Sequence, residues 1–380
     1  HKNAFAKVIA ENQSLAKMSL LEFNTSSLQN SVYNKQTCVN TLLPRASSTV
    51  LYVNDLYKSI VFFNIILKFD LISVDINEQN NEFSVKLQQP AFTSEQFSPT
   101  EDPMNFVPYS LTLKNTTIFD HSTIGHVCVS VFDVNEYYSQ LSSNFDNVSI
   151  LDTKEMNEKI QSLSDSFFLK FEKIYKYEFA LEYYNRLNDE NSKPGIFFLK
   201  GPEGIPIEIY KYGHRKNSLE KDKEVEVIED LGIKINHSML DFKLTTGDKC
   251  LMVDVLAFYV NVLGMRVLDV KHNKNDKFSL YFLGYLTNNT NEENWWMEDK
   301  EKKYLPRRAR EGYLQLRYYW SPNGFVSNKV ETLGYSLEVE INNVNEYLND
   351  VQEKYTDVEV DFGKNTIKDP VGHIYTFIQK

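Results

Sequence analysis

The 380-residue sequence lacks long hydrophobic runs, because charged residues interrupt its longest apolar stretches. A transmembrane helix needs about 20 consecutive apolar residues, so no membrane span is predicted. An excess of basic residues is also lacking, since 41 Lys and Arg stand against 52 Asp and Glu. Nucleic acids and anionic membranes bind clustered Lys and Arg, so neither is predicted as a partner. The 42% of hydrophobic residues still suffices for about two globular domains.

Cysteine is scarce and dispersed. Cys38, Cys128 and Cys250 show no CxxC spacing, which excludes a disulfide framework and a zinc ribbon. This pattern favours a soluble protein of a reducing intracellular compartment. The sequence begins at His1 rather than Met, so we expect a targeting segment to be absent from it, with an organelle as one location.

The chain divides into an arm, two similar halves and a linker. Residues 1–45 have an amphipathic pattern followed by a polar stretch and predict a helical arm. Residues 214–230 are charged without an apolar period and predict a linker between domains at 46–213 and 231–380. A charged segment at about 151–193 has a helical pattern and predicts an insertion in the first domain.

The two halves repeat each other. Apolar helical patterns at 58–74 and 254–270 are followed by a shared Val-Asn-Glu-Tyr at 134–137 and 344–347. Each half then closes with a turn and a strand, and within each half a helix followed by strands occurs twice. A repeat of this length indicates a duplicated domain, built from four α+β modules in which a helix packs on a small sheet.

Several segments carry a resemblance to a known family, namely "HSMLDFK" (237–243), "FYVNVLGMRVL" (258–268), "DKFSLYFLGY" (276–285) and "LQLRYYW" (314–320). With these, the second half resembles glyoxalase I (lactoylglutathione lyase) of the vicinal oxygen chelate superfamily. The first half keeps "IGHVCVSVFDV" and "GPEGIPIEIY" in matching positions. The resemblance implies tandem α+β glyoxalase domains, four βαβββ modules forming half-barrel sheets, in a monomer with pseudo-dimeric halves. The Asn- and Lys-rich composition is similar to that of malaria-parasite proteins.

The resemblance also implies a metal site. The family binds zinc or nickel with Gln or His, Glu, His and Glu, and these positions fall on His237, Gln315, His126 and Glu208. Gln315 alone departs from the family pattern, and its carbonyl oxygen can still coordinate while the site loses one negative charge. The first two ligands come from the second half and the other two from the first half. Glu208 is predicted to be both a ligand and the catalytic base.

The equivalent second site is predicted to be empty. Its four positions fall on Ser48, Thr112, Ser336 and Thr376. Neutral hydroxyls do not replace imidazole and carboxylate as ligands of a divalent transition metal. We therefore expect one retained metal site per chain.

The family reaction isomerises the hemithioacetal of a 2-oxoaldehyde and a thiol through a metal-bound enediolate, whose charge the metal stabilises. The arginines that hold glutathione carboxylates in the family fall on Asp241 and Ser122, and an Asn falls on Tyr319. Asp in place of Arg repels a carboxylate, so a small-molecule substrate other than glutathione is favoured.

Two alternatives stay open. His126, His237 and Glu208 form a 2-His-1-carboxylate set, which in related proteins holds Fe(II) for ring cleavage. The chain could instead be a non-catalytic glyoxalase-fold protein, a pseudoenzyme that binds a ligand or partner. The remaining candidates have structural interpretations: Asp369 and Gly372 fit a closing turn. Surface or turn positions are predicted for His121, His214, His272 and His373.

Overall fold

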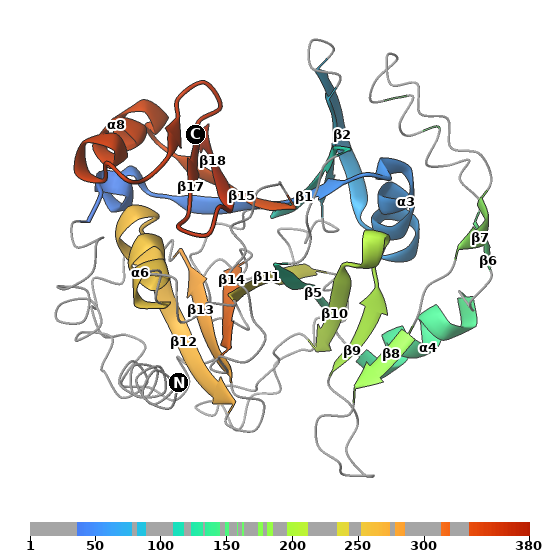
Figure 1. The fold of residues 1–380 in the computed structure, drawn as a ribbon. Helices are drawn as coiled ribbons and strands as arrows, with labels where there is room; N and C mark the ends of the chain where they lie inside the picture. Colours follow the sequence, from blue (N-terminus) through green and yellow to red (C-terminus); the bar gives the residue numbers. More distant parts are fainter. Residues whose placement is uncertain are drawn as a thin grey trace, which may run out of the picture. The chain divides into compact units, whose positions relative to one another are not determined.

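The computed structural model describes about half of the chain, including most of both halves' strands (Figure 1). The described residues are 36–77, 82–88, 109–117, 123–131, 134–144, 149–151, 158, 162, 174–177, 181–184, 196–211, 234–242, 252–273, 278–285, 313–319 and 334–380. None of the helices in these ranges combines the length and the apolar character that a membrane span requires.

The chain forms two compact units, which the fold divides between Ser47 and Ser48 and between His237 and Ser238. The first-half unit is residues 48–237, and the second-half unit is the N-terminal segment together with residues 238–380. Both divisions fall within strands, β1 (Arg45–Val53) and β11 (Lys234–Phe242). The predicted linker at 214–230 lies outside the described residues.

The first-half unit contains two modules of the same construction. The first consists of β1, α3 (Leu56–Ile60), the π-helical turn η3 (Val61–Ile66), β2 (Asp70–Asn77), β3 (Glu82–Gln88) and β4 (Ser110–Asn115). The second consists of β5 (Ile124–Val131), α4 (Val134–Asn144), β8 (Leu181–Tyr184), β9 (Ile196–Lys200) and β10 (Pro206–Lys211). The strand orders are β1-β4-β3-β2 and β5-β10-β9-β8. In each module the first strand is parallel to the last, and the other neighbouring strands pair antiparallel.

The second-half unit repeats this construction. Its first module consists of β11, α6 (Met252–Ala257), the π-helical turn η6 (Phe258–Val262), β12 (Arg266–Asn273), β13 (Phe278–Gly284) and β14 (Tyr313–Tyr319). Its second consists of β15 (Tyr335–Ile341), α8 (Val344–Lys354), β16 (Val360–Asp361), β17 (Thr366–Lys368) and β18 (Ile374–Gln379). The orders are β11-β14-β13-β12 and β15-β18-β17-β16. The prediction of four βαβββ modules is thus confirmed.

The helices at the start of each half are shorter in the structure than the sequence pattern predicts. The helices predicted at 58–74 and 254–270 end at η3 and η6, and the prediction is wrong for their second halves, which form β2 and β12. Lys68 (φ 63°) and Gly264 (φ 70°) adopt left-handed backbone conformations just after the helices. A left-handed residue ends a helix, so the chain turns there and enters a strand although the apolar pattern continues.

The alternation of β5 and β10 creates two different faces. Val127, Val129 and Ile207 project to one face, where α4 packs on β9 and β10 and Tyr138 meets Phe197 edge-on with ring centroids 5.2 Å apart. This apolar face supplies the core of the module. The opposite face carries the polar residues described below.

Two segments differ from the sequence prediction. The end of the predicted arm, at residues 37–42, packs on the second-half unit: Thr37 donates hydrogen bonds to the carbonyl oxygens of Asn261 and Val262. Its helical part before residue 36 lies outside the described residues. The helical pattern of the 151–193 insertion does not hold at 174–177 and 181–184, which form strands β7 (Ile174–Tyr177) and β8. Pairing with β9 gives the backbone of β8 hydrogen-bond partners.

Candidate metal centre

His126 and Glu208 lie on neighbouring parallel strands. His126 is on β5, and the register pairs Glu208 of β10 with Cys128, two residues beyond His126. Because side chains alternate along a strand, His126, Cys128 and Glu208 share the face opposite the apolar core. Glu208 Oε2 lies 3.3 Å from His126 Nε2. The fold therefore brings together two polar residues that are 82 positions apart.

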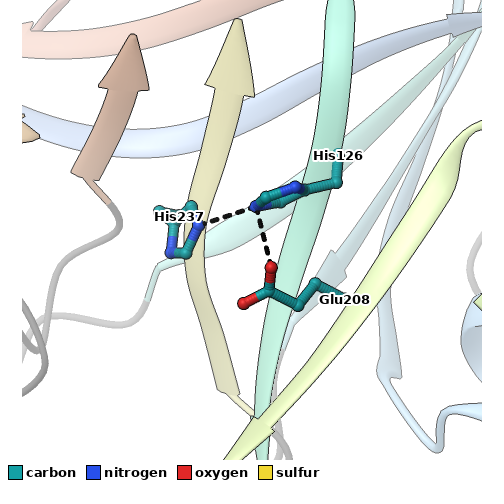
Figure 2. A group of neighbouring side chains, drawn as sticks. All are labelled: His126, Glu208 and His237. Carbon is teal, nitrogen blue, oxygen red and sulfur yellow. Dashed lines mark hydrogen bonds and ion pairs between the residues drawn. The ribbon is translucent and has the colours of Figure 1, made fainter. Parts of the chain in front are cut away.

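His237, on β11, completes a group of three converging side chains. Its Nε2 lies 2.9 Å from His126 Nε2, and Figure 2 shows His126 between His237 and Glu208. The three residues are 6%, 5% and 9% exposed for His126, His237 and Glu208. One ligand atom from each lies within 4.8 Å of the others. The structure thus brings together three of the four predicted ligands.

The donor set fits a divalent transition metal. Donors bound at about 2.1 Å from one ion lie about 3.0 Å apart at a right angle and about 3.4 Å apart at a tetrahedral angle. The separations of His126 Nε2 from His237 Nε2 and from Glu208 Oε2, 2.9 and 3.3 Å, are close to these values. Two imidazoles and a carboxylate suit zinc, nickel or Fe(II). A dication would also compensate the negative charge of the buried Glu208 carboxylate, because a charge is costly to bury unless it is paired.

Cys128 contacts Glu208 from the same strand face. Its sulfur is fully buried and lies 3.7 Å from Glu208 Oε1. Burial raises the pKa of the Cys128 thiol well above its ordinary value, and the negative charge of Glu208 raises it further. The thiol therefore stays protonated and donates a weak hydrogen bond to Oε1, while Oε2 faces His126. No sequence signal predicts this contact, because Cys128 has no CxxC partner.

Ser48 and Thr112 occupy the same register as His126 and Glu208. Thr112 of β4 pairs with Val50, two residues beyond Ser48 on β1. The Ser48 and Thr112 hydroxyl oxygens are 2.8 Å apart and hydrogen-bonded. The two hydroxyl groups thus hydrogen-bond to each other at the positions where the sister module carries His126 and Glu208.

The fourth module repeats this arrangement. Thr376 of β18 pairs with Glu338, two residues beyond Ser336 on β15, and the Ser336 and Thr376 hydroxyl oxygens are 3.5 Å apart. All four residues predicted for the second site therefore form hydroxyl pairs within their own modules. That this site binds no metal stays a prediction.

Other residues named from the sequence lie in the second-half unit. Gln315 is buried on β14, and its role as a fourth ligand stays a prediction. Arg317 forms a bidentate ion pair with Asp241: its Nε and Nη2 donate to the two carboxylate oxygens at 2.8 and 2.7 Å. This pair offsets the negative charge of Asp241, on which the predicted repulsion of a substrate carboxylate depends. Ser122 and the Tyr319 side chain lie outside the described residues.

His373 lies at the end of the closing turn, in agreement with a predicted turn position, but it is buried and not on the surface. Its Nδ1 pairs with Asp369 Oδ2 at 2.9 Å, and the Tyr259 hydroxyl donates to the same oxygen at 2.9 Å. The backbone N–H groups of Gly372 and His373 donate to Asp369 Oδ1, which gives Asp369 the structural role expected in the closing turn. The other predictions of this kind are untested: His121 and His214 lie outside the described residues, and the His272 side chain is not described.

The comparisons with known proteins agree with this architecture. No protein-family model matches the sequence. Over 165 residues it is 30% identical to glyoxalase I of Saccharomyces cerevisiae, a match that covers 43% of this chain and only 35% of the yeast protein. Glyoxalase I from Zea mays superposes with a TM-score of 0.52 at 15% identity, over 88% of this chain and 92% of the maize chain. A variant of the maize enzyme gives a TM-score of 0.53 at 15% identity, over 90% and 96%. The chain has the glyoxalase I fold, and the sequence resemblance to glyoxalase I is confirmed over part of its length.

Proposed function

We propose that this protein is a glyoxalase I-like metalloprotein that isomerises the hemithioacetal of a 2-oxoaldehyde and a thiol. The observation that supports it is the convergence of His126, His237 and Glu208 in a chain with the glyoxalase I fold. Three buried donors of metal-binding type within 4.8 Å of one another have a ready explanation in a bound divalent ion. Gln315 remains the proposed fourth ligand on the sequence resemblance alone.

Glu208 is the proposed catalytic base. Its carboxylate takes the proton from the substrate carbon that bears sulfur and returns it to the neighbouring carbon, which converts the hemithioacetal into a thioester of a 2-hydroxy acid without any external oxidant or reductant. When bound, the metal supplies a Lewis acid for the negative charge that develops on the two adjacent oxygens. His126 and Cys128 orient the carboxylate, because each contacts one of its oxygens.

The experiment measures metal content in protein purified without chelators, beside the double variant His126→Ala/Glu208→Ala. We expect about one zinc or nickel per wild-type chain and none in the variant. The matched control is Ser48→Ala/Thr112→Ala, which removes two buried side chains from the same register of the sister module. This control should retain the metal.

The same samples test the reaction with methylglyoxal and a series of thiols, glutathione among them. Thioester formation by the wild type and the control, but not by the His126/Glu208 variant, supports the isomerase. Metal binding without turnover for any thiol would instead leave a non-catalytic metal-binding protein. Absence of metal, even after soaking with divalent ions, would contradict the proposal.

A second candidate rests on the donor types themselves. Two histidines and one glutamate are the set that non-haem Fe(II) oxygenases use, with open positions for oxygen and substrate. Iron in place of zinc or nickel in the purified protein, with oxygen uptake in the presence of catechols, would favour this function over the isomerase.

A further inference from the structure

Asn236 contacts the metal-type donor His237 from the neighbouring position on β11. The Asn236 side-chain oxygen Oδ1 lies 2.9 Å from His237 Nδ1. Both side chains are buried, and Asn236 is only 2% exposed. The other ring nitrogen of His237, Nε2, is the atom that faces His126 at 2.9 Å (Figure 2). The two nitrogens of this ring therefore have two separate partners.

This contact decides which nitrogen of His237 carries the proton. An amide oxygen only accepts hydrogen bonds, so Nδ1 must be the N–H donor. In a neutral imidazole with a proton on Nδ1, the free lone pair is on Nε2. Asn236 thereby selects the ring form whose lone pair points toward His126 and Glu208.

We propose that Asn236 is a positioning residue, which holds His237 in the tautomer and ring orientation that bind a divalent metal through Nε2. This inference rests on the proposed metal function. Partners of this kind fix the ring of a ligating histidine, and their loss commonly lowers metal affinity by about 10- to 100-fold.

The rest of the Asn236 amide allows a conservative replacement. Its nitrogen Nδ2 is buried and has no hydrogen-bond partner among the described residues. Asn236→Asp therefore keeps the acceptor for His237 and breaks no described side-chain bond. Asn236→Leu keeps a similar shape but removes the acceptor. Ser238→Ala, two residues further along the same strand, serves as the matched control for a buried polar side chain on β11.

The experiment combines zinc titration against a chromophoric chelator with ¹⁵N NMR of the histidine rings in metal-free protein. The His237 signals are assigned with a His237→Asn variant. We expect the Nδ1–H tautomer in the wild type, in Asn236→Asp and in Ser238→Ala, and a shift toward Nε2–H in Asn236→Leu. Zinc should bind Asn236→Leu about 10- to 100-fold more weakly than the wild type, and Asn236→Asp should restore most of the affinity.

The two readouts separate this inference from the proposed function. If the wild type binds no zinc, the metal function fails, and an Nε2–H ring in the wild type would overturn the role of Asn236 as well. If the wild type binds zinc and Asn236→Leu keeps both its affinity and the Nδ1–H tautomer, the positioning role is wrong. Circular dichroism checks that the variants fold, and the Asp variant decides the question should the Leu variant unfold.

Discussion

At the scale of single residues, the buried ion pair of Asp369 and His373 makes a pH-dependent contribution to stability. Burial alone would raise the pKa of Asp369, but the charge of His373 and the hydrogen bonds to the carboxylate outweigh it and lower the pKa. A lowered folded-state pKa stabilises the fold at pH values above the unfolded value of about 3.9, and this stabilisation is lost as the pH falls through the folded-state value.

We predict that Asp369→Asn lowers the free energy of unfolding by about 3–5 kcal/mol at neutral pH, because it removes one partner of a buried pair. Below pH about 3.9 the difference from the wild type should shrink. Urea unfolding of the wild type and the variant, at neutral pH and at a pH below about 3.9, measures the loss of stability and its decrease in acid. Asp357→Asn, a change of an exposed Asp in the same module, should have little effect at either pH. An equal loss at both pH values would mean that shape, not charge, gives Asp369 its role.

Residue type predicts some of these roles and not others. His126 and Glu208 could be predicted because each stands in a strand motif that resembles a family position. His373 does not stand in such a motif. Only the fold shows that this histidine, four residues after Asp369, points inward and pairs with it. Asn236 was also missed, although an Asn directly before a predicted ligand is a signal that could have found it.

At the scale of elements, the N-terminal 3-10 helix η2 (Cys38–Leu42) packs so closely on the end of η6 that a glycine is required there. A Cβ atom at Gly264 would lie 2.4 Å from a methyl of Val39 and 2.6 Å from the Asn40 side-chain oxygen. Gly264 also has a φ of 70°, which disfavours any other residue.

We predict that Gly264→Ala lowers the free energy of unfolding by about 1–3 kcal/mol from overpacking, in addition to about 1 kcal/mol from the left-handed backbone. Gly204→Ala is the matched control, because Gly204 has a φ of 81° with nothing within 4 Å of the added Cβ. Chemical denaturation measures both variants. If Val39→Ala relieves part of the cost of Gly264→Ala, the clash with η2 is its source, whereas strictly additive costs would contradict that explanation.

The equivalent junction of the first half, between η3 and β2, shows why the boundaries of elements are harder to predict than their types. The apolar pattern runs without a break from α3 and η3 into β2, so it predicts one long helix. The stop is made by Lys68 in a left-handed conformation, and lysine is not a residue that signals it. In the repeat, Gly264 is such a signal and lies within the predicted helix.

At the scale of the whole molecule, the duplication explains why the candidate site could be located from the sequence. In three modules the residue on the last strand pairs with the position two residues beyond its partner on the first strand: Glu208 with Cys128, Thr112 with Val50, and Thr376 with Glu338. A constant register carries a resemblance from one module to the next. The side-chain contacts of Asn236 with His237 and of Arg317 with Asp241 came from the structure alone.

Gln315 lies on β14, which neighbours β11 as the last strand of its module, as β10, β4 and β18 neighbour the first strands of theirs. The last prediction therefore concerns its role as the fourth ligand. If the Gln315 carbonyl coordinates the metal, Gln315→Ala should weaken zinc binding at least as much as the loss of an outer partner does, by about 10-fold or more. Gln315→Glu should strengthen binding instead, because a carboxylate adds a negative charge beside a dication.

Zinc titrations of both variants measure these shifts, with Thr376→Ala as the control at the equivalent position of the fourth module. His126, His237 and Glu208 all belong to the first-half unit. If these three ligands are enough to hold the metal, its affinity does not depend on Gln315. Unchanged affinity in Gln315→Ala would thus reduce the centre to three protein ligands. Opposite shifts in the Ala and Glu variants would instead show that metal affinity depends on both halves of the duplicated chain.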